Sequence, residues 1–155
     1  MFPKLLTPFH TVIRRAFVAR MALQSTTGEL LVYSHIMLGA DDVAAAKTFY
    51  DAVLGTLGHP EGTMDDQGRC FWFTPSGIFS VTPPIDSQPA SGGNGSTVGF
   101  AADSPEAADA WHQAGLDNGG VSIEDPPGVR EGSGLYLAYL RDPSGNKICA
   151  LHRTS

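Results

Sequence analysis

The sequence predicts an α+β fold built from two similar modules, each with a strand, a helix and further strands. The segment around Asp41 recurs around Asp103, 62 residues further on, and the turn Pro75-Ser76-Gly77 recurs as Pro143-Ser144-Gly145. The chain also holds 18 glycines and 11 prolines, which favours turns and short strands over a helix bundle. Two copies are too few for a solenoid, so we expect two modules packed about a pseudo-twofold axis.

In the first module, the apolar run from Val32 to Leu38 predicts a buried strand. Asp41 or Asp42 can cap the helix that follows, because a carboxylate accepts from the free N–H groups of a first turn. Gly58 is suited to end that helix in a left-handed conformation. Two further strands are expected at 70–74 and 78–82, joined by the Pro75-Ser76-Gly77 turn.

The second module repeats this order. A strand is expected at 97–101, followed by a helix capped by Ser104 with Pro105 at its first position, where a missing N–H costs nothing. Gly119-Gly120 ends the helix, and closing strands are expected at 135–140 and 147–152. The Gly-rich segment 88–96 is the natural linker between the modules.

Charge and cysteine content exclude several classes of protein. The 155 residues carry a formal net charge of −6, and the first twenty are basic without any acid, so the remainder is more acidic still. An acidic body repels phosphate backbones, which argues against nucleic-acid binding. Cys70 and Cys149 are far apart, which fits a reducing cytoplasm and excludes a cysteine-rich zinc module. No apolar stretch approaches the ~20 residues that span a bilayer, so no membrane association is expected.

Residues 1–30 differ in character from the rest. Prolines interrupt their apolar run, so the segment does not form the apolar centre of a secretory signal. We expect an N-terminal extension, flexible or loosely packed on the domain. An amphipathic helix from Val12 to Met21 that docks on a partner subunit is the alternative.

Two groups of residues resemble a known family. Tyr33-Ser34-His35-Ile36-Met37-Leu38, then Asp41-Asp42 and Phe49-Tyr50, resemble the opening of vicinal oxygen chelate proteins, the glyoxalase, bleomycin-resistance and dioxygenase superfamily. The segment 141–148 is similar to the closing turn and strand of that superfamily. The resemblance covers residues 31–153 and implies paired βαβββ modules, at about 31–87 and 97–153, whose sheets curve around a cleft. It also implies a divalent metal ion in active members and a homodimer.

The expected metal positions are mostly replaced. His35 occupies the first ligand position, but its repeat counterpart is Thr97 and the final-strand position is Cys149. Ser80 and Thr82 are the candidates on the remaining strand, and neither is a carboxylate. The resemblance therefore implies at most a degenerate metal site at His35, which is otherwise a hydrogen-bonded interior histidine. Lactoylglutathione lyase activity is not expected, because the carboxylates that bind the metal and move the proton are missing.

Aromatic and basic side chains complete the expected cleft. Trp72, Tyr136 and Tyr139 lie on strands that should line it, together with Thr97 and Cys149, and suit a small, partly apolar ligand. Arg130 lies in a Gly-rich loop from which it can clamp an anion, or else it pairs with Glu131 or faces solvent.

Two functions follow as hypotheses. The first is a cytoplasmic, glyoxalase- or bleomycin-resistance-like protein that holds a small organic ligand between its modules. If it is an enzyme, we expect lyase- or isomerase-type chemistry in which His35 is catalytic and metal dependence is weak. The alternative is a non-catalytic protein that sequesters a small molecule by stacking and burial. A structural module, with a cleft filled by its own side chains, is a third possibility.

Overall fold

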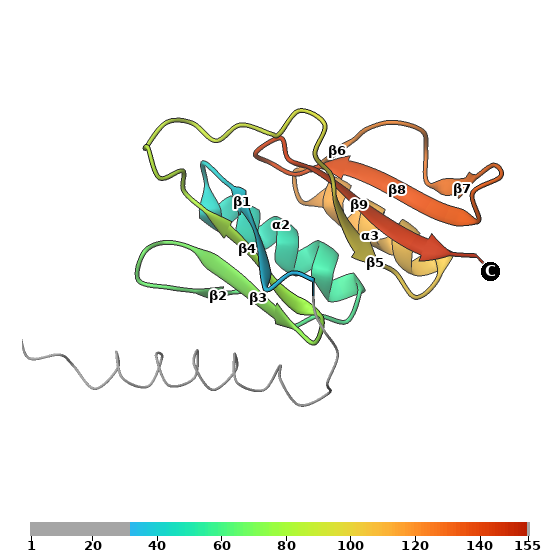
Figure 1. Ribbon diagram of the computed structural model, residues 1–155, viewed down its shortest axis with the longest axis horizontal. Helices are drawn as coiled ribbons and strands as arrows, with labels where there is room; N and C mark the ends of the chain where they lie inside the picture. The colour runs from blue at the N-terminus through green and yellow to red at the C-terminus, as the bar shows by residue number, and fades with distance from the viewer. Residues whose placement is uncertain (1–31, 155) are drawn as a thin grey trace, which may run out of the picture.

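The computed structural model describes residues 32–154, so the predicted extension at residues 1–30 lies outside the described part of the chain. The first module contains β1 (His35–Gly39), α2 (Val43–Thr56), β2 (Thr63–Met64), β3 (Cys70–Thr74) and β4 (Gly77–Thr82) (Figure 1). Its sheet has the order β1-β4-β3-β2, in which β1 is parallel to β4 and the other neighbours are antiparallel.

The second module has the same topology. It contains β5 (Val98–Ala101), α3 (Pro105–Asp117), β6 (Val121–Ser122), β7 (Gly128–Arg130), β8 (Leu135–Arg141) and β9 (Lys147–Arg153). Its sheet has the order β5-β9-β8-β6, and β7 pairs with β8. The predicted α+β fold of two βαβββ-like modules is therefore confirmed. The strands β2, β6 and β7 are not predicted, because two or three residues are too few to show a periodic pattern.

The helix starts follow the repeat. Asp42, not Asp41, caps α2, since its Oδ1 accepts from the N–H of Ala45 at 2.9 Å. Ser104, 62 residues later, accepts from the N–H of Ala107 at 3.1 Å, and Pro105 is the first residue of α3 as predicted. Matched caps place the two helices at equivalent points in their modules.

The helix ends depart slightly from the repeat. Gly58 has φ of +80°, the left-handed conformation predicted for the residue that ends the first helix. In the second module Gly119 takes this conformation, with φ of +92°, so α3 is one residue shorter than α2. The counterpart of Gly58 is therefore Gly119 and not Gly120.

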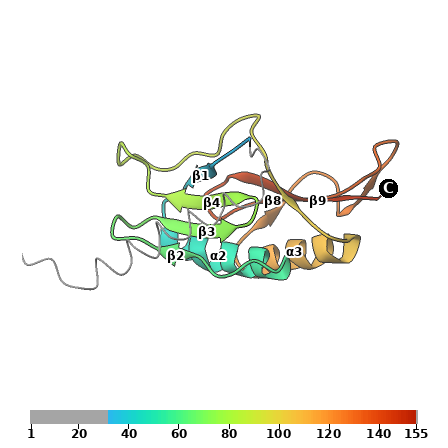
Figure 2. The ribbon, with the colours of Figure 1, turned by 60° about the horizontal axis from the view of Figure 1, so that its bottom comes forward.

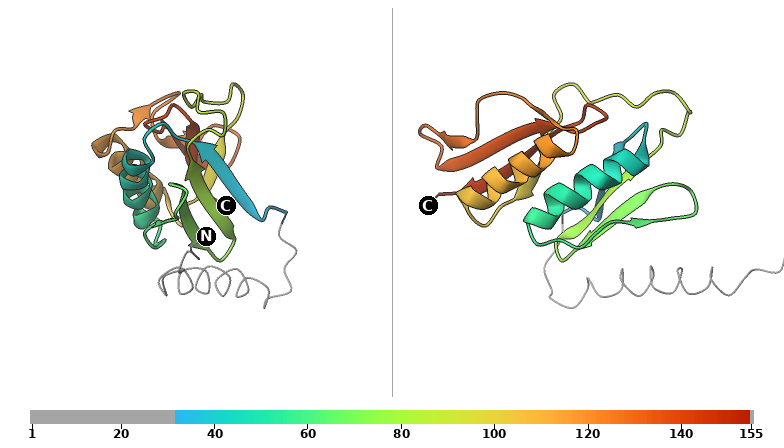
Figure 3. Two further views of the ribbon diagram at one scale, coloured as in Figure 1. Left: turned by 90° about the vertical axis from the view of Figure 1, so that its left-hand side faces the viewer. Right: turned by 180° about the vertical axis from the view of Figure 1, so that it is seen from behind.

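Both helices lie on the same side of the two sheets (Figure 2), and from behind they are seen next to each other (Figure 3). A glycine allows this approach. A Cβ atom added to Gly115 of α3 would lie 3.3 Å from Phe49 and Val53 of α2, and 2.2 Å from Leu140. The two modules thus share one core.

Aromatic rings continue that core from one module into the other. Tyr50 of α2 lies 4.6 Å from Phe79 of β4, between ring centroids, and Phe79 meets Phe100 of β5 edge to face at 5.2 Å. Phe100 in turn lies 6.3 Å from Trp111 of α3. Burial of these rings contributes strongly to stability, because aromatic side chains remove large apolar areas from water.

A buried polar network, which we call the closed joint, also joins the modules. The Tyr50 hydroxyl donates to Oδ2 of Asp142, in the β8–β9 turn, at 2.8 Å. Asp142 also accepts from the side-chain amide of Asn146 at 2.9 Å, and that amide donates to the carbonyl of Gly39, at the end of β1, at 2.9 Å. Tyr50, Asp142 and Asn146 are all buried. Burial, reinforced by the nearby Asp142 charge, raises the pKa of the Tyr50 phenol well above its ordinary value, so this hydroxyl stays a donor.

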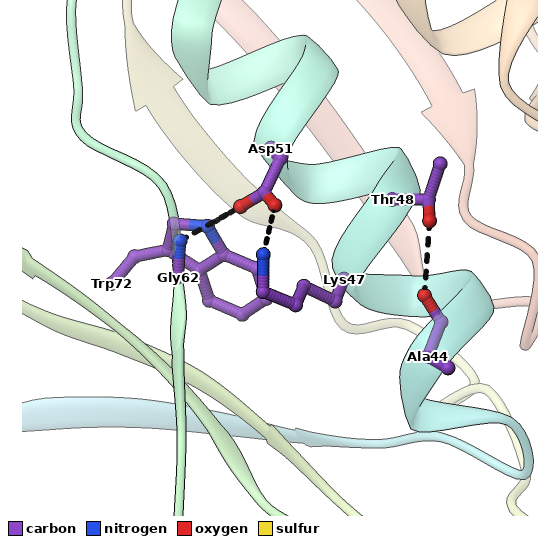
Figure 4. Close-up of polar contacts among 6 residues, drawn as sticks. All are labelled: Ala44, Lys47, Thr48, Asp51, Gly62 and Trp72. Carbon is purple, nitrogen blue, oxygen red and sulfur yellow. Dashed lines mark hydrogen bonds and ion pairs between the residues drawn. The ribbon is translucent and has the colours of Figure 1, made fainter.

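A second polar cluster fixes the first module internally (Figure 4). Oδ1 of Asp51 accepts from the N–H of Gly62 at 2.7 Å and from the indole N–H of Trp72 at 2.9 Å. The other oxygen pairs with the Lys47 ammonium one helical turn away. Gly62 cannot carry a side chain here, because its Cβ would lie 2.6 Å from the Trp72 ring. Asp51 therefore ties α2 to β3 and to the segment before β2.

The closed joint predicts that removing the hydroxyl costs more stability at Tyr50 than at Tyr136. Tyr50→Phe should lower the free energy of unfolding by about 1–3 kcal/mol, because it removes a buried hydrogen bond to a carboxylate. Tyr136→Phe is the matched control, since the Tyr136 hydroxyl also donates to an aspartate, Asp109, but at an exposed site. That variant should lose no more than about 0.5 kcal/mol. Urea unfolding followed by tryptophan fluorescence measures both, and equal losses would contradict the assignment.

The Asp51 cluster gives a second prediction. Asp51→Ala should cost about 1–3 kcal/mol of unfolding free energy, because the buried indole N–H of Trp72 loses its acceptor. Lys47→Ala breaks the same ion pair yet leaves both of the N–H bonds to Asp51 in place, so it should cost less than about 1 kcal/mol. Thermal and urea unfolding of the two variants test this. A Lys47 variant as unstable as the Asp51 variant would show that the ion pair, not the indole bond, dominates.

Candidate ligand pocket between the modules

A pocket of about 370 Å³ lies between β1 and β5, which are the edge strands of the two sheets. The end of α2 and the β3–β4 turn complete its wall. The apolar part of the lining comes from both modules and includes Ile36, Leu54, Leu57, Phe79, Val98 and Phe100. The two phenylalanines in this set are the same rings that carry the core from one module into the other. The pocket wall is therefore continuous with the core.

Polar groups also line the pocket: Tyr33, His35, His59, Thr74, Ser76 and Asp103. His35 is exposed at the start of β1, and its Nδ1 lies 2.9 Å from the Ser34 hydroxyl. Thr74 and Ser76 belong to the β3–β4 turn, where the Thr74 hydroxyl donates to the carbonyl of Gly77 at 2.8 Å. The pocket thus offers imidazole, hydroxyl and carboxylate groups beside an apolar wall.

The helix end places His59. Gly58 turns the chain at the end of α2, so the N–H of His59 donates back to the carbonyl of Leu54 at 3.0 Å. This backbone bond is the usual way in which a left-handed glycine closes a helix. Asp103 is placed by the repeat, since it follows β5 as Asp41 follows β1.

The lining is poor in positive charge. Of the residues in the range 32–154, Asp103 is the only acid that lines the pocket, and no lysine or arginine does. Asp103 would repel an anion placed there, and no lysine or arginine of the lining would attract it. A neutral or positively charged ligand suits this lining.

Comparison with known proteins identifies the family. The family model for the Glyoxalase/Bleomycin resistance protein/Dioxygenase superfamily matches residues 32–150. The chain belongs to this superfamily. A glyoxalase/bleomycin resistance protein from Albidiferax ferrireducens T118 is 58% identical to it, with a TM-score of 0.74 over 78% of this chain and 98% of that one.

More distant structures share the superfamily fold. A lactoylglutathione lyase from Agrobacterium tumefaciens is 21% identical, with a TM-score of 0.56 over 82% of this chain and 95% of that one. A glyoxalase-related enzyme from Fulvimarina pelagi is 15% identical, with a TM-score of 0.65 over 79% and 88%. At such identities the likeness shows the fold alone. Among proteins with curated descriptions, none matches this chain.

The superfamily implies a metal ion, which needs several donor side chains around one point. In residues 32–154 no three His, Cys, Asp or Glu side chains come together in a way that could hold a metal. Of the four superfamily positions, His35 lines the pocket, while Ser80 is fully buried and donates to the carbonyl of Ile36 at 3.0 Å. The side chains of the described range therefore do not fit a divalent ion.

Thr97 and Cys149 do not join His35 in the pocket. Thr97 is exposed just before β5 and does not line the pocket, although the next four residues, Val98–Ala101, all do. Cys149 is a buried residue of β9, where it pairs across strands with Tyr139 and lies one strand behind Gly99. The structure therefore does not bring Thr97 and Cys149 together with His35 in this pocket, which opens between the edges of β1 and β5.

Trp72 and the two predicted tyrosines also lie elsewhere. Trp72 is fully buried under α2, where Asp51 accepts its N–H, so it supports the pocket from behind Phe79 and does not line it. The Tyr136 hydroxyl donates to Asp109 of α3 at 2.7 Å, which places Tyr136 on the helix side of its sheet. Tyr139, of opposite parity, carries the Lys147 ammonium 4.8 Å from its ring centroid. The sequence predicted that Tyr136 and Tyr139 lie on opposite faces of their strand. It did not predict which of these faces packs against the helix.

Arg130 does not extend over the pocket. Its guanidinium donates to the backbone carbonyls of Asp125, Pro126, Gly128 and Leu137 at 3.1–3.3 Å. Four such bonds hold Arg130 in its own loop and against β8. In this arrangement the guanidinium neither lines the pocket nor pairs with Glu131.

Several lining residues were not predicted, although two of them carried a signal. His59 directly follows the helix-ending Gly58, and Asp103 is the repeat counterpart of Asp41. Thr74 and Ser76 carried no such signal, because turn residues are usually solvated. Residues 32–154 contain no helix with the length and apolar character needed to cross a bilayer.

The cysteines give a prediction about reactivity. Burial raises the pKa of the Cys70 thiol to about 11, and burial likewise raises the pKa of Cys149 despite the nearby Lys147 ammonium. At pH 8 about one Cys70 in a thousand is then a thiolate, the reactive form. We expect neither thiol of the native protein to react with Ellman's reagent within minutes, and both to react in denaturant. Rapid labelling lost in Cys149→Ser would instead mark Cys149 as a nucleophile.

Proposed function

We propose that this protein binds a small organic molecule, largely apolar and either neutral or positively charged, in the pocket between its modules. The observation that carries this proposal is the pocket itself, with an apolar wall from both modules and polar groups beside it. Its volume of about 370 Å³ falls within the range of about 300–1,000 Å³ that is usual for small-molecule sites.

The charge of the ligand follows from the lining. Asp103 favours a cation, and an anion would find no lysine or arginine in the described lining to neutralise it. The net charge of −6 acts in the same direction at longer range. Binding would draw on burial of apolar surface against Leu57, Phe79 and Phe100, which is worth about 25 cal/mol per Å² before the costs of association.

Catalysis in the same pocket is the second candidate, because His35 and His59 are groups that can move protons near neutral pH. The two candidates differ in what happens to a bound compound. A binder returns it unchanged, whereas an isomerase or lyase converts it. Following a stabilising probe by NMR over hours separates them, since conversion that stops in His35→Ala supports the enzyme.

Three probes of one shape test the charge preference. Benzyl alcohol is neutral, benzylamine is a cation and benzoate is an anion, and each carries one ring. Benzyl alcohol and benzylamine should raise the melting temperature of the full-length protein and perturb tryptophan fluorescence, because Trp72 and Trp111 each lie one ring behind the pocket wall. Benzoate should do neither. Asp103→Asn should weaken benzylamine several-fold relative to benzyl alcohol.

Variants then locate the site. Leu57→Trp enlarges a side chain that lines the pocket and should abolish binding of benzyl alcohol. Leu116→Trp makes the same change near the end of α3, at an exposed position outside the pocket, and should leave binding unchanged. Stabilisation by benzoate alone, or equal binding by both leucine variants, would contradict the proposal.

A further inference from the structure

The pocket and the closed joint are related by the repeat. The closed joint forms where the β8–β9 turn of the second module meets the end of β1 and the middle of α2. The pseudo-twofold axis implies an equivalent meeting point, where the β3–β4 turn of the first module faces the end of β5 and the middle of α3. Thr74, Ser76, Gly77, Ala101 and Asp103 stand at that point, and all five line the pocket.

The strand registers show which residues correspond. Thr74 pairs with Gly77 at the mouth of the first turn, and the N–H of Asp142 donates to the carbonyl of Asn146 at the mouth of the second. Thr74 therefore stands in the place of Asp142, and Gly77 stands in the place of Asn146. The β3–β4 turn is one residue shorter than the β8–β9 turn. For this reason Gly77, which matches Gly145 in the sequence repeat, corresponds to Asn146 in the structure.

The backbone on the other side of the two joints is alike. Ala40, after β1, donates its N–H to Thr82, and Ala102, after β5, donates its N–H to Leu151, both at 2.9 Å. Gly39 and Ala101 precede these residues, each at the end of a strand that is parallel to its neighbour. The carbonyl of Ala101 therefore points away from the edge of its sheet, as the carbonyl of Gly39 does. The Gly39 carbonyl is the one that accepts from the Asn146 amide.

The side chains that form the closed joint are missing at the equivalent point beside the pocket. Gly77 has no amide to donate to Ala101, and Thr74 has no carboxylate. The counterpart of Tyr50 is His112, which is buried and whose Nε2 lies 3.0 Å from the Ser122 hydroxyl. The pocket thus lies where the equivalent of the closed joint would form, because the turn there is shorter and its side chains are smaller.

We propose that the ligand of this pocket carries a primary carboxamide, whose N–H groups take the place that the Asn146 amide has in the closed joint. The amide donates to the carbonyl of Ala101, the counterpart of Gly39. The apolar body of the ligand then lies against Leu57 and Phe100. This inference rests on the proposed function, and it specifies the polar end of the neutral ligand.

Two isosteric probes test it on the unmodified full-length protein. Benzamide and acetophenone have nearly the same shape and both carry a carbonyl, but only benzamide has N–H donors. We expect benzamide to bind about tenfold more tightly by NMR titration or calorimetry, the effect of one to two hydrogen bonds. Equal affinities would overturn the carboxamide assignment and leave the proposed function standing. If neither compound binds, and benzyl alcohol does not either, the proposed function itself fails.

A rebuilt turn provides a second test. Thr74→Asp with Gly77→Asn and one glycine inserted after Ser76 gives the first turn the sequence and length of the second. This variant should supply its own amide to Ala101 and bind benzamide at least tenfold more weakly than a control with Gly77→Ala in the same background. Circular dichroism establishes that both are folded. Equal benzamide binding by the two folded variants overturns the inference, and if either does not fold, the isostere comparison decides.

Discussion

The hydrogen bond from Tyr50 to Asp142 is the constraint on which the arrangement of the two modules depends. It joins residues 92 positions apart, in a helix of one module and a turn of the other, and both partners are buried. Asn146 extends the contact to the backbone of β1. Each partner would be costly to leave unpaired away from water, so the modules have one orientation in which this network is satisfied. The aromatic contacts between Phe79 and Phe100 add attraction but are far less directional.

A fixed orientation at one joint determines the shape of the other. Because the modules are related by a pseudo-twofold axis, closing the contact around Asp142 brings the β3–β4 turn opposite Asp103 whether or not that turn can make equivalent bonds. Its shorter sequence, with Gly77 in the place of Asn146, leaves space there. The repeat thus separates two requirements that usually conflict, since one copy of the joint supplies stability and the other is free to hold a ligand.

Local signals were sufficient to predict the elements of the fold but not the site. Asp42, Ser104, Pro105 and Gly58 act through neighbours within one helical turn, so their effects can be inferred from adjacent residues. The partner of Asp142 could not, because pairing across 92 residues depends on the complete fold. For Trp72 the alternation of the strand was correct, yet the choice of face depends on Asp51, which accepts the indole N–H. The pocket was expected over the sheet faces, whereas the edges of β1 and β5 form it.

Two positions at which the resemblance implied metal ligands, Ser80 and Cys149, are packed within the sheets. Ser80 satisfies its hydroxyl within the sheet by donating to Ile36, and Cys149 packs as a small apolar residue beside Gly99. Both side chains are thus accommodated by the protein's own groups. The modules are held together by the closed joint and the aromatic core. Selection on the pocket can then act on His35 and Asp103, which are exposed, with little effect on the interactions that keep the chain folded.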